Sequence, residues 1–196
     1  MAAPEASPAP PPTAPGRPPL PDGLVAFVKR DCPTCRLVEP VLAQLAAAPG
    51  LPLTVYVQDD PDWPAGLAPR DDRELAASWH HDIEAVPTLL RVERGAEAAR
   101  VTGWQRAEWE AMTGIGGLGP QLPEWRPGCG SRSVDPDLAP ALAARFGAAR
   151  LRARRVALAA AEDEHEALFA RGWSDGLPVV APTEQRVLAM LAGTGR

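Results

Sequence analysis

The chain has 196 residues, of which 45% are hydrophobic and 23% charged, and its formal net charge is −5. That length suits one ordinary domain with an addition, or two small domains. The acidic balance argues against nucleic acid as a partner, and no apolar run reaches the roughly 18 residues that a membrane helix needs. With no apolar leader at the N-terminus and only three cysteines, the sequence predicts a cytoplasmic protein with no membrane partner and no disulfide scaffold.

The first 22 residues are rich in alanine and contain nine prolines. Proline lacks the backbone N–H that helices and sheets need, and it favours an extended polyproline conformation. We therefore expect residues 1–22 to form a disordered tail.

Regular structure is predicted from residue 23 to residue 114. Apolar runs predict strands, and apolar residues on one helical face predict helices. The expected strands cover 24–29, 53–57, 88–93 and 98–102, and the expected helices cover 33–47, 73–81 and 105–112. The order βαβαββα, with a right-handed crossover after the first strand, makes a four-stranded mixed sheet of the α/β class. The acidic, proline-containing residues 58–72 are expected to form a loop.

Beyond this domain the composition changes. Glycines predict a linker or loop over 115–136, which contains Cys129. A helical C-terminal extension is expected over 137–196, with helices near 137–146, 148–171 and 183–191. The string from Gly172 to Thr183 resembles a segment of larger bacterial proteins, which would make this chain a split form of a two-domain protein.

Two cysteines separated by two residues carry the clearest chemistry. Cys32 and Cys35 stand between an apolar strand and a helix, a spacing that allows a small disulfide to close. Cys32 lies at the predicted helix N-terminus, where unpaired N–H groups and the helix dipole favour a thiolate. A CxxC motif beside a βαβ pattern indicates thiol–disulfide chemistry.

These residues, with three further features, make the segment 23–113 resemble the thioredoxin superfamily. Pro40 matches the proline within the active-site helix, Val86-Pro87-Thr88 matches the motif that contains a cis-proline, and Gly103 matches a closing glycine. The typical buried Asp is replaced by Ala26, the Trp before the first cysteine is replaced by Asp31, and the first βα unit of full thioredoxins is missing. The match is therefore to a minimal, glutaredoxin-like core.

The resemblance implies a role for each matched residue. Cys32 would be the exposed attacking thiolate, and Cys35, one turn inside the helix, would resolve the mixed disulfide. Pro33 and Thr34 would set the local geometry. Val86, Pro87 and Thr88 would shape the substrate groove, where Val86 offers backbone groups to an extended peptide.

Cys129 is open to two interpretations. Glycines on both sides suggest an exposed loop, in which Cys129 is either an unpaired cysteine or an additional redox thiol, for example a resolving thiol for Cys32. A zinc site at the CxxC would need two more ligands, and no second CxxC or HxxxH motif supplies them. No metal is therefore expected.

The sequence predicts an enzyme, a thiol–disulfide oxidoreductase that uses the Cys32/Cys35 pair and needs no cofactor beyond its redox-active disulfide. Its partners would be a protein disulfide or a partner redox domain, and an upstream reductant. Two alternatives remain at this point. The chain could be a docking or electron-relay module for one partner, with the acidic loop setting selectivity, or a zinc-stabilised binding domain without redox activity.

Overall fold

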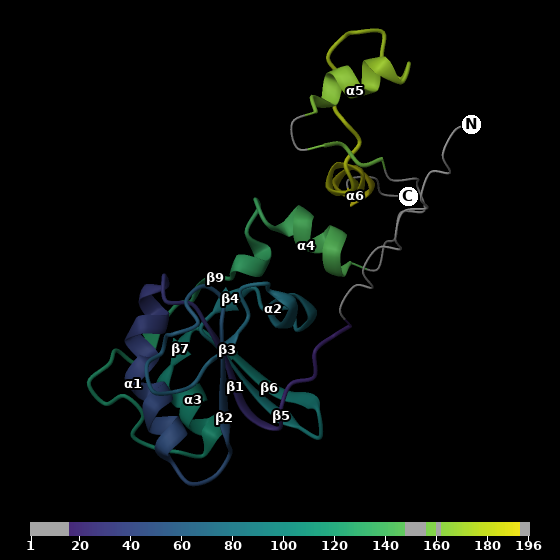
Figure 1. The fold of residues 1–196 in the computed structure, drawn as a ribbon. Helices are drawn as coiled ribbons and strands as arrows, with labels where there is room; N and C mark the ends of the chain where they lie inside the picture. Colours follow the sequence, from purple (N-terminus) through teal and green to yellow (C-terminus); the bar gives the residue numbers. More distant parts are fainter. Residues whose placement is uncertain (1–15, 148–155, 160–161, 193–196) are drawn as a thin grey trace. The chain divides into compact units, whose positions relative to one another are not determined.

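A computed structural model describes residues 16–147, 156–159 and 162–192. The chain divides into two compact units, the first ending at Asp135 and the second beginning at Pro136. The first unit contains an α/β fold with a five-stranded mixed sheet in the order β3-β2-β1-β5-β6 (Figure 1). Its sheet strands are β1 (Gly23–Val28), β2 (Leu53–Val57), β3 (Arg70–Asp71), β5 (Thr88–Glu93) and β6 (Ala96–Thr102).

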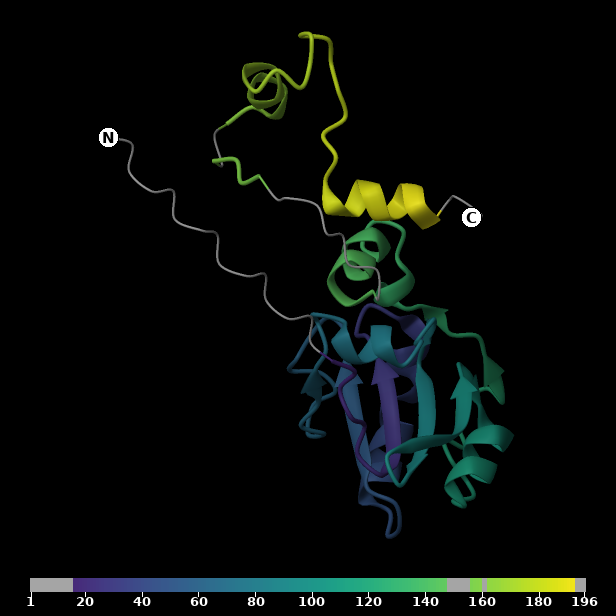
Figure 2. The same cartoon turned by 90° about the vertical axis from the view of Figure 1, so that its right-hand side faces the viewer.

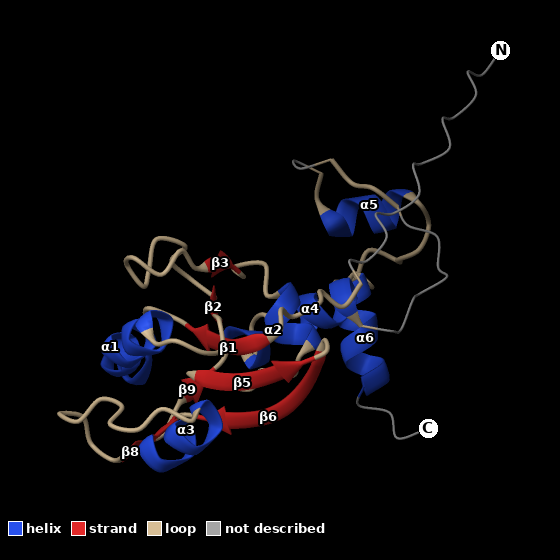
Figure 3. Ribbon diagram, turned by 90° about the horizontal axis from the view of Figure 1, so that it is seen from below, coloured by secondary structure: helices blue, strands red, loops and turns tan. Residues whose placement is uncertain are grey.

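The central strand β1 explains the core. It pairs parallel with β2 and antiparallel with β5, and Figure 2 shows β1 between these neighbours. All six of its residues are buried, as expected for a strand that is covered on both faces. Figure 3 shows α1 (Pro33–Ala47) and α3 (Arg106–Thr113) on one face of the sheet and α2 (Ala76–His80) on the other.

Helix α1 follows β1 after a short turn and presents Cys35 to the core together with an apolar face. Pro33 occupies the first turn, where its missing N–H costs nothing. The Asp59 carboxylate holds the turn before the helix, because it accepts hydrogen bonds from the backbone N–H groups of Arg30 and Asp31 at 2.8 and 2.9 Å. The acidic loop thus helps to place Cys32.

The structure has more strands than the sequence predicts. β3 adds a fifth strand to the sheet, and two further pairs lie outside it. β4 (Ala85–Val86) pairs with β9 (Cys129–Gly130), and β7 (Trp104–Gln105) pairs with β8 (Trp125–Arg126). These strands are two residues long, too short to give a periodic pattern in the sequence.

Of the predicted linker or loop over 115–136, the residues up to Asp135 form a loop with short strands that belongs to the first unit, and not a linker. This segment packs on the domain and ends in the short 3₁₀ helix η1 (Arg132–Val134). Leu118 is buried in the core, and the Trp104 indole N–H donates to the Pro123 carbonyl oxygen at 2.6 Å. Gly119 and Gly128 are closely packed, whereas Gly116, Gly117 and Gly130 have open space at the Cβ position.

The predicted tail over 1–22 is only partly described. Residues 1–15 lie outside the described residues, but residues 16–22 pack on the domain instead of forming a free tail. Leu20 is buried in the core, and the Asp22 carboxylate accepts from the Gly95 backbone N–H at 2.7 Å. Local composition predicts disorder here, whereas tertiary contacts fix the segment.

The second unit contains three helices among its described residues: α4 (Ala139–Phe146), α5 (Glu164–Ala170) and α6 (Glu184–Ala192). α4 and α6 contact each other. The long helix predicted over 148–171 is not seen in its described part, where residues 156–159 are irregular and only α5 is helical. Residues 148–155 and 160–161 lie outside the described residues. No described helix has both the length and the apolar character that crossing a membrane requires.

Candidate redox site

The CxxC sulfurs lie at the N-terminus of α1. Cys32 is the N-cap residue of this helix, and its Sγ accepts a hydrogen bond from the Cys35 backbone N–H at 3.3 Å. Cys35 lies one turn inside and is fully buried, as the sequence predicts. The structure describes all three cysteines as free thiols.

The acidities of the two thiols diverge strongly. The pKa of Cys32 is lowered to about 5, first by the side-chain hydrogen bond with Cys35, while burial opposes the shift and the contact with Cys129 adds to the lowering. Burial, followed by the hydrogen bond with Cys32, raises the pKa of Cys35 far above its usual range. At neutral pH the site therefore holds a Cys32 thiolate and a Cys35 thiol. The flanking charges of Asp31 and Lys29 are not among the main causes of the lowered Cys32 pKa.

The Val86-Pro87-Thr88 segment lies beside the Cys32 sulfur. The peptide bond before Pro87 is cis, and the Val86 carbonyl oxygen lies 3.4 Å from Cys32 Sγ. Thr88 is buried and donates through Oγ1 to the Ala85 carbonyl oxygen at 2.7 Å, which holds the turn closed. The structure thus brings together the residues that the sequence assigns to the groove.

Cys129 belongs to the same site as Cys32, although the two residues are 97 positions apart in the sequence. Its Sγ lies 2.8 Å from Cys32 Sγ. Its backbone pairs with Val86 in the antiparallel β4–β9 pair. Burial, followed by the hydrogen bond with Cys32, raises the pKa of the Cys129 thiol. The interpretation of Cys129 as a residue of an exposed loop is wrong, because it lies in a strand and is only partly exposed.

The segment around Cys129 also covers the Cys32 thiol. Thr34 donates through Oγ1 to the Pro127 carbonyl oxygen at 2.8 Å, and the Lys29 ammonium donates to the Gly130 carbonyl oxygen at 2.8 Å. Cys32 has 0% relative exposure, so the prediction of an exposed Cys32 is wrong. The physical reason is this covering strand, which begins about 95 residues after the CxxC motif.

A buried polar network fastens the chain just after β9. The Gln58 side-chain amide donates to the hydroxyls of Ser78 and Ser131 at 2.8 and 2.7 Å, and its oxygen accepts from the Arg132 backbone N–H at 3.1 Å. Ser133 then donates to the Ile83 carbonyl oxygen at 2.6 Å. The sequence contains no motif that points to this network.

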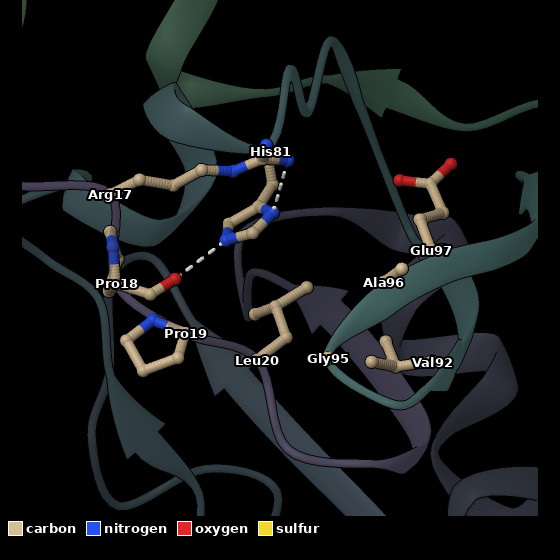
Figure 4. A pocket seen from close by; sticks show the side chains of 9 residues that line it. All are labelled: Arg17, Pro18, Pro19, Leu20, His81, Val92, Gly95, Ala96 and Glu97. Carbon is tan, nitrogen blue, oxygen red and sulfur yellow. Dashed lines mark hydrogen bonds between the residues drawn. The ribbon is translucent and has the colours of Figure 1, made fainter.

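A separate pocket on the first unit is lined in part by the segment 17–20 and by the hairpin between β5 and β6 (Figure 4). The pocket residue His81 accepts at Nδ1 from the Arg17 guanidinium at 3.1 Å and donates from Nε2 to the Pro18 carbonyl oxygen at 2.8 Å. Burial lowers the pKa of His81. Both ring nitrogens are therefore used by the chain itself, and they hold the N-terminal segment in place.

Among the described residues, no group of three or more histidine, cysteine, aspartate or glutamate side chains is arranged to hold a metal ion. The zinc alternative has no ligand set in that part of the chain.

The arrangement defines a class of protein: an α/β domain that carries a dithiol at a helix N-terminus, next to a cis-proline. No protein-family model matches the sequence. The chain is 38% identical over 81 residues to the thioredoxin-like protein Clot of rice (Oryza sativa subsp. japonica), covering 36% of this chain and 52% of that protein. This chain thus spans about half the length of the rice protein.

Solved thioredoxins also resemble the chain. Reduced thioredoxin of Schistosoma mansoni matches with 21% identity and a TM-score of 0.35, covering 47% of this chain and 78% of that one. The Malassezia sympodialis thioredoxin gives 20% identity and a TM-score of 0.35, covering 46% and 70%. The likeness to a thioredoxin-like protein therefore rests on the 81 residues aligned with the rice protein.

Proposed function

We propose that this protein is a thiol–disulfide oxidoreductase in which Cys32 attacks a disulfide and Cys35 resolves the mixed disulfide. The observation that carries the proposal is the difference in pKa between the Cys32 and Cys35 thiols at the start of α1. A thiolate at the N-cap is the nucleophile that exchange requires, and a shielded thiol one turn away can displace the bound product. The likeness to a thioredoxin-like protein supports the same chemistry.

The reaction balances without a cofactor. The Cys32 thiolate attacks one sulfur of the substrate disulfide, and the other substrate sulfur leaves and takes a proton. Cys35 then loses its proton and attacks Cys32 Sγ, which closes the Cys32–Cys35 disulfide and releases the second substrate thiol. An upstream reductant restores the dithiol. We propose no cofactor beyond the redox-active disulfide of the chain itself.

We propose a protein disulfide or a partner redox domain as the substrate, in a reducing cytoplasm. The support is chemical: Val86 has backbone groups beside the Cys32 sulfur, where an extended peptide can add as a strand once β9, which pairs with Val86, has moved away. Pro33 and Thr34 would line the same approach. Nothing in this scheme requires nucleic acid or a membrane.

The test is turnover of a disulfide-bonded protein such as insulin, with a small dithiol as the electron donor. We expect the full chain to accelerate reduction, Cys32→Ser to reduce the rate to background, and Cys35→Ser to accumulate a mixed disulfide through Cys32. Background rates for the unmodified chain, with the Cys32–Cys35 couple intact, would favour the dedicated docking or electron-relay module instead.

A further inference from the structure

The strand β9 occupies the place beside Cys32 where a peptide would add. Val86 pairs with Cys129 and Ala85 with Gly130 in antiparallel register, and the Ser131 backbone N–H continues the pairing to the Glu84 carbonyl oxygen at 2.9 Å. Main-chain pairing of this kind is how an extended peptide joins an exposed strand. The occupant here is a segment of the same chain.

Two glycines leave the space that this segment needs. A Cβ on Gly128 would come within 2.8 Å of the Val86 carbonyl oxygen, closer than packed atoms allow. A Cβ on Gly103 would lie 3.0 Å from both the Arg126 carbonyl oxygen and the Gly128 nitrogen. Gly130, on the other side of Cys129, has open space. Close approach to Val86 therefore depends on Gly128.

The pairing of β9 with β4 places the Cys129 thiol beside the Cys32 sulfur. The sulfurs of Cys32 and Cys129 are 2.8 Å apart, closer than non-bonded sulfurs normally approach and within reach of a disulfide after a small movement. Cys32 is fully buried beneath this segment. An external disulfide therefore reaches Cys32 only after residues 127–130 have moved away.

We propose that Cys129 is a third redox-active thiol, presented to Cys32 by β9 as a built-in substrate strand, and that the oxidised protein forms a Cys32–Cys129 disulfide that closes the groove. The proposal rests on the thiol–disulfide exchange proposed above. It assigns a second disulfide to the site and makes the chain's own strand a competitor of external protein disulfides.

The second disulfide arises by exchange within the molecule. Once Cys32–Cys35 is oxidised, Cys129 loses a proton and attacks Cys32 Sγ. The Cys32–Cys129 bond forms, the Cys32–Cys35 bond breaks, and the Cys35 sulfur leaves with the electron pair and takes up a proton. The number of disulfides and thiols is unchanged, so no further oxidant is needed.

The experiment uses the full chain and three variants, Cys35→Ser, Cys129→Ser and Gly128→Ala, with Gly130→Ala as the matched control. Each protein is reduced, exposed to oxidised glutathione, quenched in acid, alkylated and mapped by mass spectrometry. We expect Cys35→Ser to form a monomeric Cys32–Cys129 disulfide with release of two reduced glutathione molecules. We expect Cys129→Ser to form only Cys32–Cys35.

The glycine pair tests the role of the strand. Combined with Cys35→Ser, Gly128→Ala is expected to slow Cys32–Cys129 formation roughly tenfold or more, because displacing one reacting group by about 1 Å has effects of that order. Gly130→Ala in the same background is expected to keep the original rate.

The outcomes separate the two proposals. If Cys35→Ser yields only glutathione adducts or intermolecular dimers while Cys129→Ser still cycles through Cys32–Cys35, the third-thiol proposal is overturned alone. If Cys129→Ser shows no Cys32–Cys35 couple, the oxidoreductase proposal fails. Equal rates for the two glycine variants would overturn the role assigned to β9.

Discussion

The three cysteines show how surroundings set acidity. The Cys32 sulfur accepts a hydrogen bond from the Cys35 backbone N–H and contacts the sulfurs of Cys35 and Cys129. These contacts stabilise its charged form despite burial. Cys35 and Cys129 lack that compensation, and burial is the largest cause of their raised pKa values. The proposed division of roles between Cys32 as nucleophile and Cys35 as resolving thiol therefore depends on contacts between sulfurs rather than on nearby basic side chains.

We predict that the Cys32 thiolate titrates with a pKa of about 5 in the reduced protein. Cys35→Ala removes the largest stabilising contact and should raise that pKa most, and Cys129→Ala should raise it less. Ultraviolet absorbance of the thiolate, followed against pH, measures both effects. A Cys32 that titrates at the ordinary value for a free cysteine would contradict this account of its surroundings.

The same shift predicts a pH dependence of stability for the reduced protein. The pKa of Cys32 in the folded chain, about 5, lies below the ordinary value of a cysteine thiol, so the unfolded chain binds more protons at pH values between the two. The contribution to stability is therefore fully present above the unfolded pKa and is lost as the pH falls towards 5. Removing Cys32 should flatten this part of the stability profile, as denaturant unfolding would show.

At the scale of elements, β9 keeps its place because the chain around it is fastened at several points. Thr34 and Lys29 hold the backbone of residues 127 and 130, and the Gln58 network holds the next residues. A buried amide is costly to leave without partners. The network therefore links the stability of the domain to the position of Cys129.

Gln58→Ala tests this link. The variant leaves the Ser78 and Ser131 hydroxyls and the Arg132 N–H without their Gln58 partner, so we expect a loss of about 1–3 kcal/mol in unfolding free energy. We also expect faster alkylation of Cys129 as β9 loosens. Gln185→Ala, at an exposed glutamine of the second unit, should stay within about 0.5 kcal/mol of the parent.

Unchanged stability and unchanged Cys129 alkylation in Gln58→Ala would show that other contacts hold the strand. Denaturant unfolding and timed alkylation, measured on the same preparations, distinguish the two effects.

At the scale of the whole molecule, the first unit contains both its own core and the complete redox site. We therefore predict that a chain ending at Asp135 unfolds in one cooperative transition and keeps the Cys32 titration. Circular dichroism on heating and thiolate absorbance check this. A truncated chain that is unfolded, or whose Cys32 titrates differently, would show that the second unit contributes to the site.

The sequence was informative where its signals are local. The strand before Cys32, the helix after it and the apolar face of that helix were predictable, since periodicity and the CxxC spacing are local features. The role of residues 115–135 was not predictable, because pairing between Val86 and Cys129 joins positions 43 apart and uses two-residue strands. Composition also misled at residues 16–22, where contacts of Leu20 and His81 outweigh the prolines.

The most direct test of the central claim is the redox equilibrium of the full chain in a series of glutathione or dithiothreitol buffers, with disulfides mapped at each potential. We expect a reversible two-electron couple at the Cys32–Cys35 pair, within the range of roughly −270 to −120 mV known for this chemistry. Cys35→Ser should lack that couple. A chain in which Cys32 and Cys35 never form a reversible disulfide would contradict the oxidoreductase proposal.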